Sequence, residues 1–145
     1  IQDPRERPQE KRQQADEIFQ AIGITEWISE EEQMHGITAL SGSGPAYFFL
    51  VMEAMQASAE GFGLTAQEAR VLVQQTAFGA AKLAMESPES AGELRRNVTS
   101  PGGTTEAAIT QLQAAGLEAT FDAALKAAAQ RSIVLSGAKP AIEKS

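Results

Sequence analysis

Seven consecutive apolar residues, 46–52, directly follow a Ser-Gly-Ser-Gly-Pro stretch at residues 41–45. Pro45 suits the first turn of an α-helix, and Ser43 or Gly44 suits its cap. The predicted helix is apolar on every side, whereas a helix on the surface of a globular protein has one polar face. We therefore expect a helix that is surrounded, either by the rest of a helical bundle or by a second subunit.

Most of the remaining chain also favours helices. Alanine, the strongest helix former, supplies 26 of the 145 residues. Helical spacing and capping residues, including Thr65 with Glu68 and Ser90 with Glu93, predict helices at about 9–21, 30–61 with a break at 41–45, 66–85, 91–97, 104–115 and 118–136. Gly23 and Gly116 fit helix ends. The sequence predicts an all-α bundle of about five or six helices.

The N-terminal region does not fit a simple bundle. Residues 1–8 contain two prolines and alternating charge, which favours a flexible leader. Residues 24–28, with the sequence Ile-Thr-Glu-Trp-Ile, predict a short strand. A single strand needs a partner for its backbone groups, so we expect another chain or a further domain to supply one.

Composition excludes several classes of function. The formal net charge is −7, and the basic residues are scattered, so nucleic acid is not expected as a partner. The chain has no cysteine, which agrees with a cytoplasmic location and removes thiolate chemistry. No apolar run approaches the ~20 residues that a membrane span needs. His35 is the single histidine and has no partner at metal-ligand spacing, so no metal site is expected.

The stretch from Asn97 to Glu106 is the best candidate for a ligand site. Gly102 and Gly103 directly precede a predicted helix, where the backbone can approach a ligand and the first N–H groups lack helical partners. Such donors, with the helix dipole, can bind a small carboxylate without Lys or Arg. The hydroxyls of Ser100, Thr104 and Thr105 add donors and acceptors. The alternative is an ordinary loop whose threonine caps the helix.

Three weaker candidates have simpler explanations. The run from Gly42 to Tyr47 starts like a dinucleotide-binding turn, but it contains a proline, lacks the third glycine and follows no strand. The pair Arg95 and Arg96 could meet a cofactor phosphate, although a solvated helix face is the simpler interpretation. The acidic residues 30–32 fit the first turn of a helix.

Two segments together resemble a known family. They are Thr38-ALSGSGPAYFF-Leu50 and Asn97-VTSPGGTTEAAI-Thr110, with about fifty mostly helical residues between them. Over roughly residues 9–136 the chain resembles the C-terminal half of pyrroline-5-carboxylate reductase, and the second segment resembles that family's signature. The resemblance implies an interlocked helical homodimer, which can assemble further into a ring of dimers. It also implies reduction of 1-pyrroline-5-carboxylate to L-proline by NADPH or NADH.

The resemblance also assigns roles to residues. It implies a substrate-binding loop formed by Ser100, Gly102, Gly103, Thr104 and Thr105. In this loop the N–H groups of Gly103 and Thr104 hold the substrate carboxylate, and Ser100 shapes the loop. It implies that the catalytic Thr105 hydroxyl reaches the ring nitrogen. The segment from Ser41 to Tyr47, which includes the residues Ser41, Gly42, Ser43, Gly44 and Pro45, is expected to meet the nicotinamide.

The chain differs from the family in one large respect: it contains no glycine-rich dinucleotide-binding domain. We expect residues 1–32 to be a leader, a helix and a strand left from that domain, disordered or exchanged with another chain. Residues 33–145 are expected to form the dimerisation and substrate domain. The chain alone is predicted to bind no cofactor and to be inactive. The competing hypothesis is a free-standing helical interaction module without catalysis.

Overall fold

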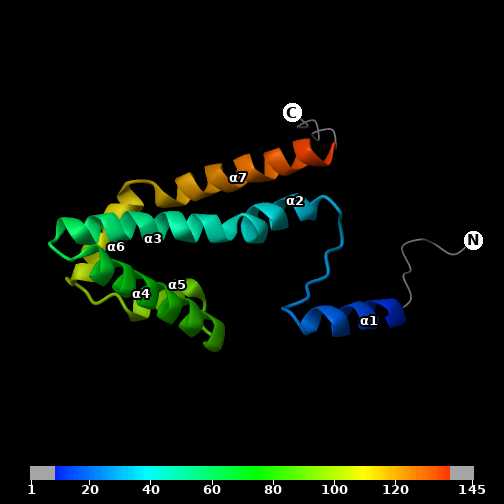
Figure 1. The fold of residues 1–145 in the computed structure, drawn as a ribbon, viewed down its shortest axis with the longest axis horizontal. Coiled ribbons are helices and arrows are strands. Elements are labelled where there is room, and N and C mark those ends of the chain that lie inside the picture. Colours follow the sequence, from blue (N-terminus) through cyan, green and yellow to red (C-terminus); the bar gives the residue numbers. More distant parts are fainter. Residues whose placement is uncertain (1–8, 138–145) are drawn as a thin grey trace, which may run out of the picture. The chain divides into compact units, whose positions relative to one another are not determined.

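A computed structural model describes residues 9–137 of the chain. Those residues contain seven α-helices and one π-helical turn, which confirms the all-α prediction. Figure 1 shows the order of the helices along the chain. The chain divides into two compact units, with the boundary after Met34, and each unit is described by itself below.

The first unit is built on helix α1, Gln9–Gln20, close to the predicted 9–21. The helix ends in a turn in which the N–H groups of Ile22 and Gly23 both donate to the Phe19 carbonyl, at 3.0 Å each. Gly23 does not have the left-handed backbone expected of a helix-ending glycine. Beyond the turn, the Trp27 indole N–H donates to Asp16 Oδ1 at 2.8 Å, which ties the following segment to α1.

The strand predicted at residues 24–28 is not formed, so that prediction is wrong. These residues have no regular secondary structure. A strand is stable only when its backbone pairs with another, and the described part of the chain contains no strand that could pair with it. The leader expected at residues 1–8 lies outside the described residues. Exchange of this region with another chain stays a prediction.

The second unit begins inside helix α2, at the start of a nearly continuous helical segment. Helix α2, Gln33–Ile37, runs into a π-helical turn η1, Thr38–Gly42, and then into α3, Gly44–Gly61. The predicted break at 41–45 is therefore a widened turn rather than a loop. The acidic residues 30–32 precede α2 instead of forming its first turn, so that expectation is wrong.

The later helices follow the predicted boundaries closely. They are α4, Ala66–Glu86, α5, Ala91–Asn97, α6, Thr104–Ala114, and α7, Leu117–Ser136. Both predicted capping boxes are present, with Thr65 accepting from the Glu68 N–H and Ser90 from the Glu93 N–H. Gly116, with a φ of 78°, forms the left-handed junction between α6 and α7. The six helices from α2 to α7 agree with the expected five or six.

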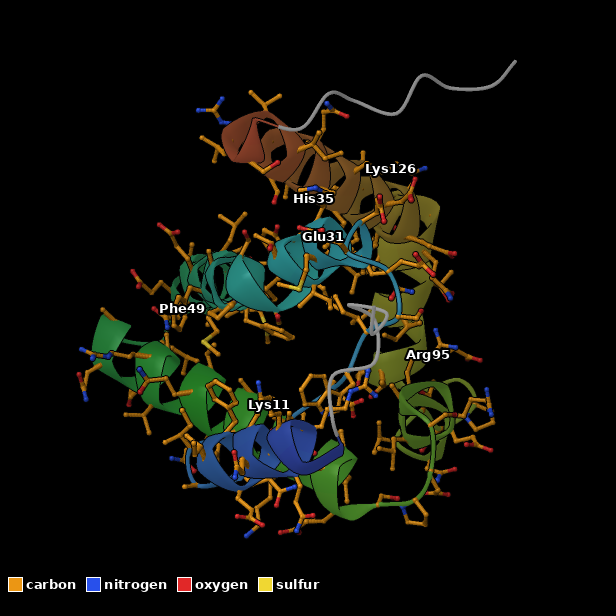
Figure 2. All side chains as sticks on the ribbon, turned by 90° about the vertical axis from the view of Figure 1, so that its right-hand side faces the viewer. Lys11, Glu31, His35, Phe49, Arg95 and Lys126 are labelled. Atoms are coloured by element: carbon orange, nitrogen blue, oxygen red, sulfur yellow. The ribbon has the colours of Figure 1, made fainter. Side chains whose placement is uncertain are left out.

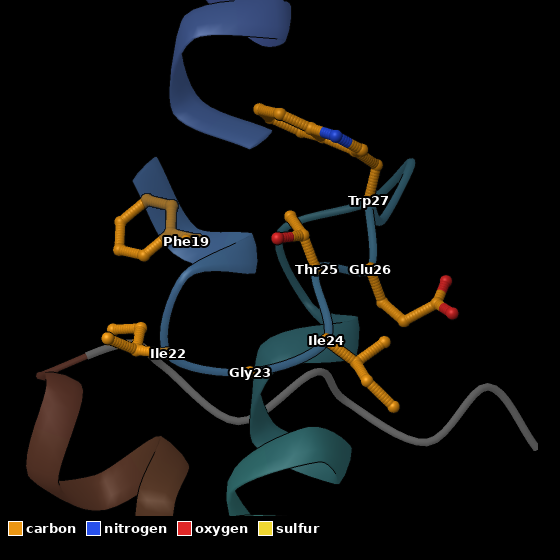
Figure 3. A pocket seen from close by; sticks show the side chains of 7 residues that line it. All are labelled: Phe19, Ile22, Gly23, Ile24, Thr25, Glu26 and Trp27. Atoms are coloured by element: carbon orange, nitrogen blue, oxygen red, sulfur yellow. The ribbon is translucent and has the colours of Figure 1, made fainter. Parts of the chain in front are cut away.

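Packing in this unit is confined to a few contacts, and it leaves α3 poorly covered. Helix α3 packs on α4 and η1, while α7 packs on η1 and α6. Among described hydrophobic residues, only Ala39, Ala69 and Val73 are buried. Phe48 and Phe49 on α3 remain 70% and 64% exposed, and Figure 2 labels Phe49. The chain's own bundle therefore does not surround the apolar helix.

None of the helices in residues 9–137 combines the length and apolar character needed to cross a membrane.

Candidate functional site: the α5–α6 loop

The loop between α5 and α6 begins in a fixed position. The Thr99 N–H donates to the Arg96 carbonyl at 3.0 Å, and the Thr99 hydroxyl donates to the Arg95 carbonyl at 2.6 Å. The side-chain amide of Asn97 donates to Glu89 Oε1 at 2.9 Å. The two bonds from Thr99 satisfy carbonyls at the end of α5 that would otherwise lack helical partners, and the Asn97 bond ties that end to the residues before α5. The loop that follows therefore starts from a rigid base.

The two glycines are both required by the backbone of the loop. Gly102 has a φ of 71°, the left-handed conformation in which a side chain is strained. Gly103 is the N-cap of α6, and a Cβ atom there would lie 3.0 Å from the Ser100 carbonyl oxygen. The Gly103 N–H donates to that same carbonyl at 3.0 Å, closing a tight turn. A larger residue at either position would distort this turn.

The structure identifies which amides at the start of α6 remain open. The Gly102 N–H donates to Glu106 Oε2 at 2.7 Å, and the Gly103 N–H is used in the turn. The first helical bond of α6 runs from the Ala107 N–H to the Gly103 carbonyl at 3.2 Å. The N–H groups of Thr104, Thr105 and Glu106 therefore have no partner within residues 9–137. They are the donors that an anion could bind.

The hydroxyls of the loop are not used for capping. The cap residue is Gly103, and no side chain caps α6, which contradicts the alternative of a threonine-capped loop. Within the part of the chain that the structure describes, the hydroxyls of Ser100, Thr104 and Thr105 make no hydrogen bond. Ser100 and Thr104 are exposed, while Thr105 is half-buried. Thr105 is therefore the best fixed of the three hydroxyls.

The second predicted segment lies at the π-helical turn. Ser41 and Gly42 belong to η1, Ser43 follows it, and Gly44 with Pro45 begins α3. Gly44 is buried, and the Ser41 hydroxyl donates to the Ile37 carbonyl at 2.9 Å. The main contacts of η1 are with α7 and α3, not with α6. One chain by itself thus does not pack this segment against the α5–α6 loop.

Sequence reasoning missed two interactions beside this segment. The Tyr47 hydroxyl donates to the Ala39 carbonyl at 3.1 Å. His35 Nδ1 lies 3.0 Å from the Ser132 hydroxyl oxygen, which joins α2 to α7. Their sequence separations are 8 and 97 residues, and no local pattern identifies either pair. His35 therefore has a structural partner.

Two other groups of residues add no chemistry in the described range. Residues 9–137 contain no cluster of three side chains that could hold a metal ion. Arg95 and Arg96 are exposed in the last turn of α5, which agrees with the solvated interpretation. Hydrogen bonds from Thr65 and Ser90 lower the pKa of Glu68 and Glu93, but both carboxylates belong to helix caps.

A family model described as "Pyrroline-5-carboxylate reductase dimerisation" matches residues 31–135. The chain belongs to this family. It is 52% identical over 124 residues to the pyrroline-5-carboxylate reductase of Pseudomonas aeruginosa, covering 86% of this chain and 45% of that protein. It is 44% identical over 130 residues to the Haemophilus influenzae reductase, covering 89% of this chain and 48% of that one.

Solved structures give the same result. The reductase of Coxiella burnetii superposes with a TM-score of 0.86 at 47% identity, over 91% of this chain and 48% of that one. The Plasmodium falciparum reductase, solved with NADP bound, superposes with a TM-score of 0.76 at 30% identity, over 88% and 48%. The chain spans about half the length of the relatives it matches. The predicted family and its all-helical dimerisation domain are confirmed.

Proposed function

We propose that this chain supplies the dimer interface and the substrate loop of a pyrroline-5-carboxylate reductase, which reduces 1-pyrroline-5-carboxylate to L-proline. The observation that carries the proposal is the open pair of amides at Thr104 and Thr105, at the start of α6 and next to a left-handed Gly102. The substrate has one carboxylate and one ring nitrogen, which are the groups that this loop can bind.

In this proposal the substrate carboxylate binds the N–H groups of Thr104 and Thr105, where the helix dipole also favours an anion. The family resemblance implies the N–H groups of Gly103 and Thr104 in this role, but the Gly103 N–H already donates to the Ser100 carbonyl and is the weaker donor. Ser100, Gly102 and Gly103 then shape the turn. The half-buried Thr105 hydroxyl faces the ring nitrogen and fixes its orientation.

The reducing cofactor is proposed to be NADPH or NADH, which supplies a hydride to the imine carbon. A turn that binds the pyrophosphate of a dinucleotide connects a strand to a helix, whereas the Gly-rich segment at 41–45 follows a helix. We therefore assign only the nicotinamide end of the cofactor to the described residues. Ser41, Gly42, Ser43, Gly44 and Pro45 would line that end. The remaining dinucleotide contacts are assigned to the part of the reductase that this chain does not span, so the chain alone is expected to be inactive.

Hydride transfer is easier to a protonated imine, because the product is then a neutral amine. A threonine hydroxyl is a poor acid near neutral pH, so Thr105 contributes mainly by orienting the nitrogen. Glu106 places a carboxylate at the start of α6 and can make a positive charge nearby less costly. The expected contribution of the loop is therefore positioning rather than proton transfer.

The partner in this proposal is a second copy of the chain. The apolar surface of α3 is uncovered in the single chain, and the family match is to a dimerisation domain. A homodimer would cover Phe48, Phe49 and Leu50, whose exposure is otherwise costly. Assembly of these dimers into a ring and a cytoplasmic location belong to the same proposal.

L-proline titrated into the isotope-labelled chain tests the site by NMR. The proposal requires shifts at the amides of residues 103–105, whereas a helical module without catalysis requires none. A second assay adds NADPH and pyrroline-5-carboxylate to the chain and to a full-length reductase that contains it. Only the full-length protein should turn over, and turnover by the chain alone would contradict the assignment of the cofactor site to the remaining half.

A further inference from the structure

The π-helical turn η1 is unusual in this otherwise α-helical unit. Its widened register is set by the Ser43 N–H, which donates to the Thr38 carbonyl five residues back, at 2.9 Å. Turns of this kind make up well under ~1% of residues and occur often at functional sites. Here the turn contains Ser41 and Gly42, the first two residues of the segment that we assign to the nicotinamide. Its geometry therefore sets the position of that segment.

The shifted register changes which donor the Ala39 carbonyl can use. In a regular α-helix this carbonyl would accept from the Ser43 N–H, which in η1 goes to Thr38 instead. The Tyr47 hydroxyl donates to the Ala39 carbonyl at 3.1 Å. Ala39 is only 2% exposed, so its carbonyl has little access to water. The tyrosine thus stabilises the widened turn in preference to a regular helix.

Pro45 gives the turn a second consequence. Proline has no N–H, so it cannot bond the Ser41 carbonyl as a residue four positions later normally does. The next N–H, that of Ala46, donates to the Ser43 carbonyl at 3.1 Å. The Ser41 carbonyl is thereby kept free of the usual α-helical donor. The Ser41 carbonyl can therefore accept a hydrogen bond from a carbamoyl N–H group, such as that of a nicotinamide.

We propose that Tyr47 is a positioning residue that holds η1 in its π-helical register and so places the Ser41–Pro45 backbone for the nicotinamide. Tyr47 acts through the Ala39 carbonyl and does not itself need to touch the cofactor. The upstream contact between His35 and Ser132 holds the other side of the turn against α7. This inference rests on the proposed function, because it needs the segment to meet a nicotinamide.

The first test is hydrogen exchange in the chain with Tyr47→Phe, which removes only the hydroxyl. The Ser43 N–H should exchange about fivefold faster or more, the effect of one lost hydrogen bond, with NMR shifts centred on residues 38–44. The matched control is Thr120→Val, which removes a hydroxyl that donates to the Gly116 carbonyl at 3.0 Å, away from η1. Unchanged exchange at Ser43 in Tyr47→Phe would overturn the inference.

The second test measures both Michaelis constants in a full-length reductase that contains this domain. Tyr47→Phe should raise the KM for NADPH about fivefold and leave the KM for pyrroline-5-carboxylate at its wild-type value. In the Thr120→Val control, both Michaelis constants should stay at their wild-type values. Faster exchange of the Ser43 N–H together with an unchanged KM for NADPH would show that Tyr47 has only a structural role. That result would overturn the inference. Failure of the proposed function can be distinguished from failure of this inference, because the wild-type full-length protein would then show no reductase activity.

Discussion

The backbone N–H of Gly102 donates to Oε2 of Glu106 at 2.7 Å, a bond that crosses the first turn of α6. It fixes the left-handed glycine to the helix that follows. It also places a carboxylate next to the open amides of Thr104 and Thr105. Glu106 therefore supports the shape of the loop and at the same time repels an anion that binds there.

Replacing Glu106 with Gln separates these two effects. The glutamine oxygen can still accept from the Gly102 N–H, while the negative charge is lost. We expect tetrahydrofuran-2-carboxylate, a proline analogue that keeps the carboxylate but has no charged nitrogen, to bind about two- to fivefold more tightly at low salt, with a smaller gain at high salt, because salt screens exposed charges. NMR titration at two salt concentrations measures this.

The control for this change is Glu118→Gln, which removes the same charge from the first turn of α7. It should leave the affinity for this analogue unchanged at both salt concentrations. An equal effect of the two substitutions would point to net charge rather than to the α6 site.

Gly102→Ala tests the strain in the loop. A side chain in the left-handed conformation costs roughly 1–2 kcal/mol, so the free energy of unfolding should fall by about that amount. Gly102→Asn should lower the free energy of unfolding by less than Gly102→Ala does, because asparagine tolerates this conformation better. Chemical denaturation followed by circular dichroism gives both values, and equal losses for Ala and Asn would argue against backbone strain as the cause.

Thr105→Val removes the hydroxyl assigned to the ring nitrogen and keeps the shape of the side chain. One lost hydrogen bond should weaken binding of L-proline about fivefold, while the helical content stays the same. The control is Thr110→Val, which makes the same exchange further along α6. Loss of folding in Thr105→Val, instead of loss of binding, would mean that this hydroxyl has a structural role.

Much of this site could be predicted from the sequence because its determinants are local. Two glycines before a helix predict open amides, and the structure leaves the amides of Thr104, Thr105 and Glu106 open. The identity of those amides could not be predicted. It depends on the Ser100 carbonyl and the Glu106 carboxylate, which capture the Gly103 and Gly102 donors. Backbone geometry, and not residue type, decides which of several neighbouring acceptors forms the hydrogen bond.

The fold shows the same division. Capping boxes at Thr65 and Ser90 have a fixed spacing, and both form as predicted. The strand at 24–28 was predicted from β-propensity, which reports how residues fit a sheet and cannot supply the second strand. The π-helical register of η1 was not predicted either, because it depends on the Tyr47 hydroxyl eight residues from Ala39.

The helix caps predict a specific response to acid. Hydrogen bonds from the Thr65 side chain and backbone lower the pKa of Glu68, and those from Ser90 do the same for Glu93. A carboxylate whose pKa is lower in the folded state stabilises the fold above its ordinary value of 4.5. That stabilisation is lost as the pH falls through the lowered pKa, so the first turns of α4 and α5 should fray in acid.

NMR titration of the side-chain carboxyl carbons measures these two pKa values directly. In Thr65→Ala the pKa of Glu68 should return toward its ordinary value, while that of Glu93 stays low. The reciprocal result is expected for Ser90→Ala. The backbone N–H of residue 65 still donates to Glu68 in the Thr65→Ala variant, so the rise should be partial; no rise at all would show that the Thr65 hydroxyl does not lower this pKa.

The exposed aromatic side chains of α3 predict how the protein assembles. Burying a phenylalanine contributes roughly 1.5–3 kcal/mol, so Phe49→Asp should weaken a homodimer by about tenfold or more. Ser58→Asp adds the same charge at an exposed polar position of the same helix and should leave the dimer intact. Sedimentation velocity over a range of concentrations measures both effects. A wild-type chain that stays monomeric at micromolar concentration would contradict the homodimer, because the apolar face of α3 would then be stable in water without a partner.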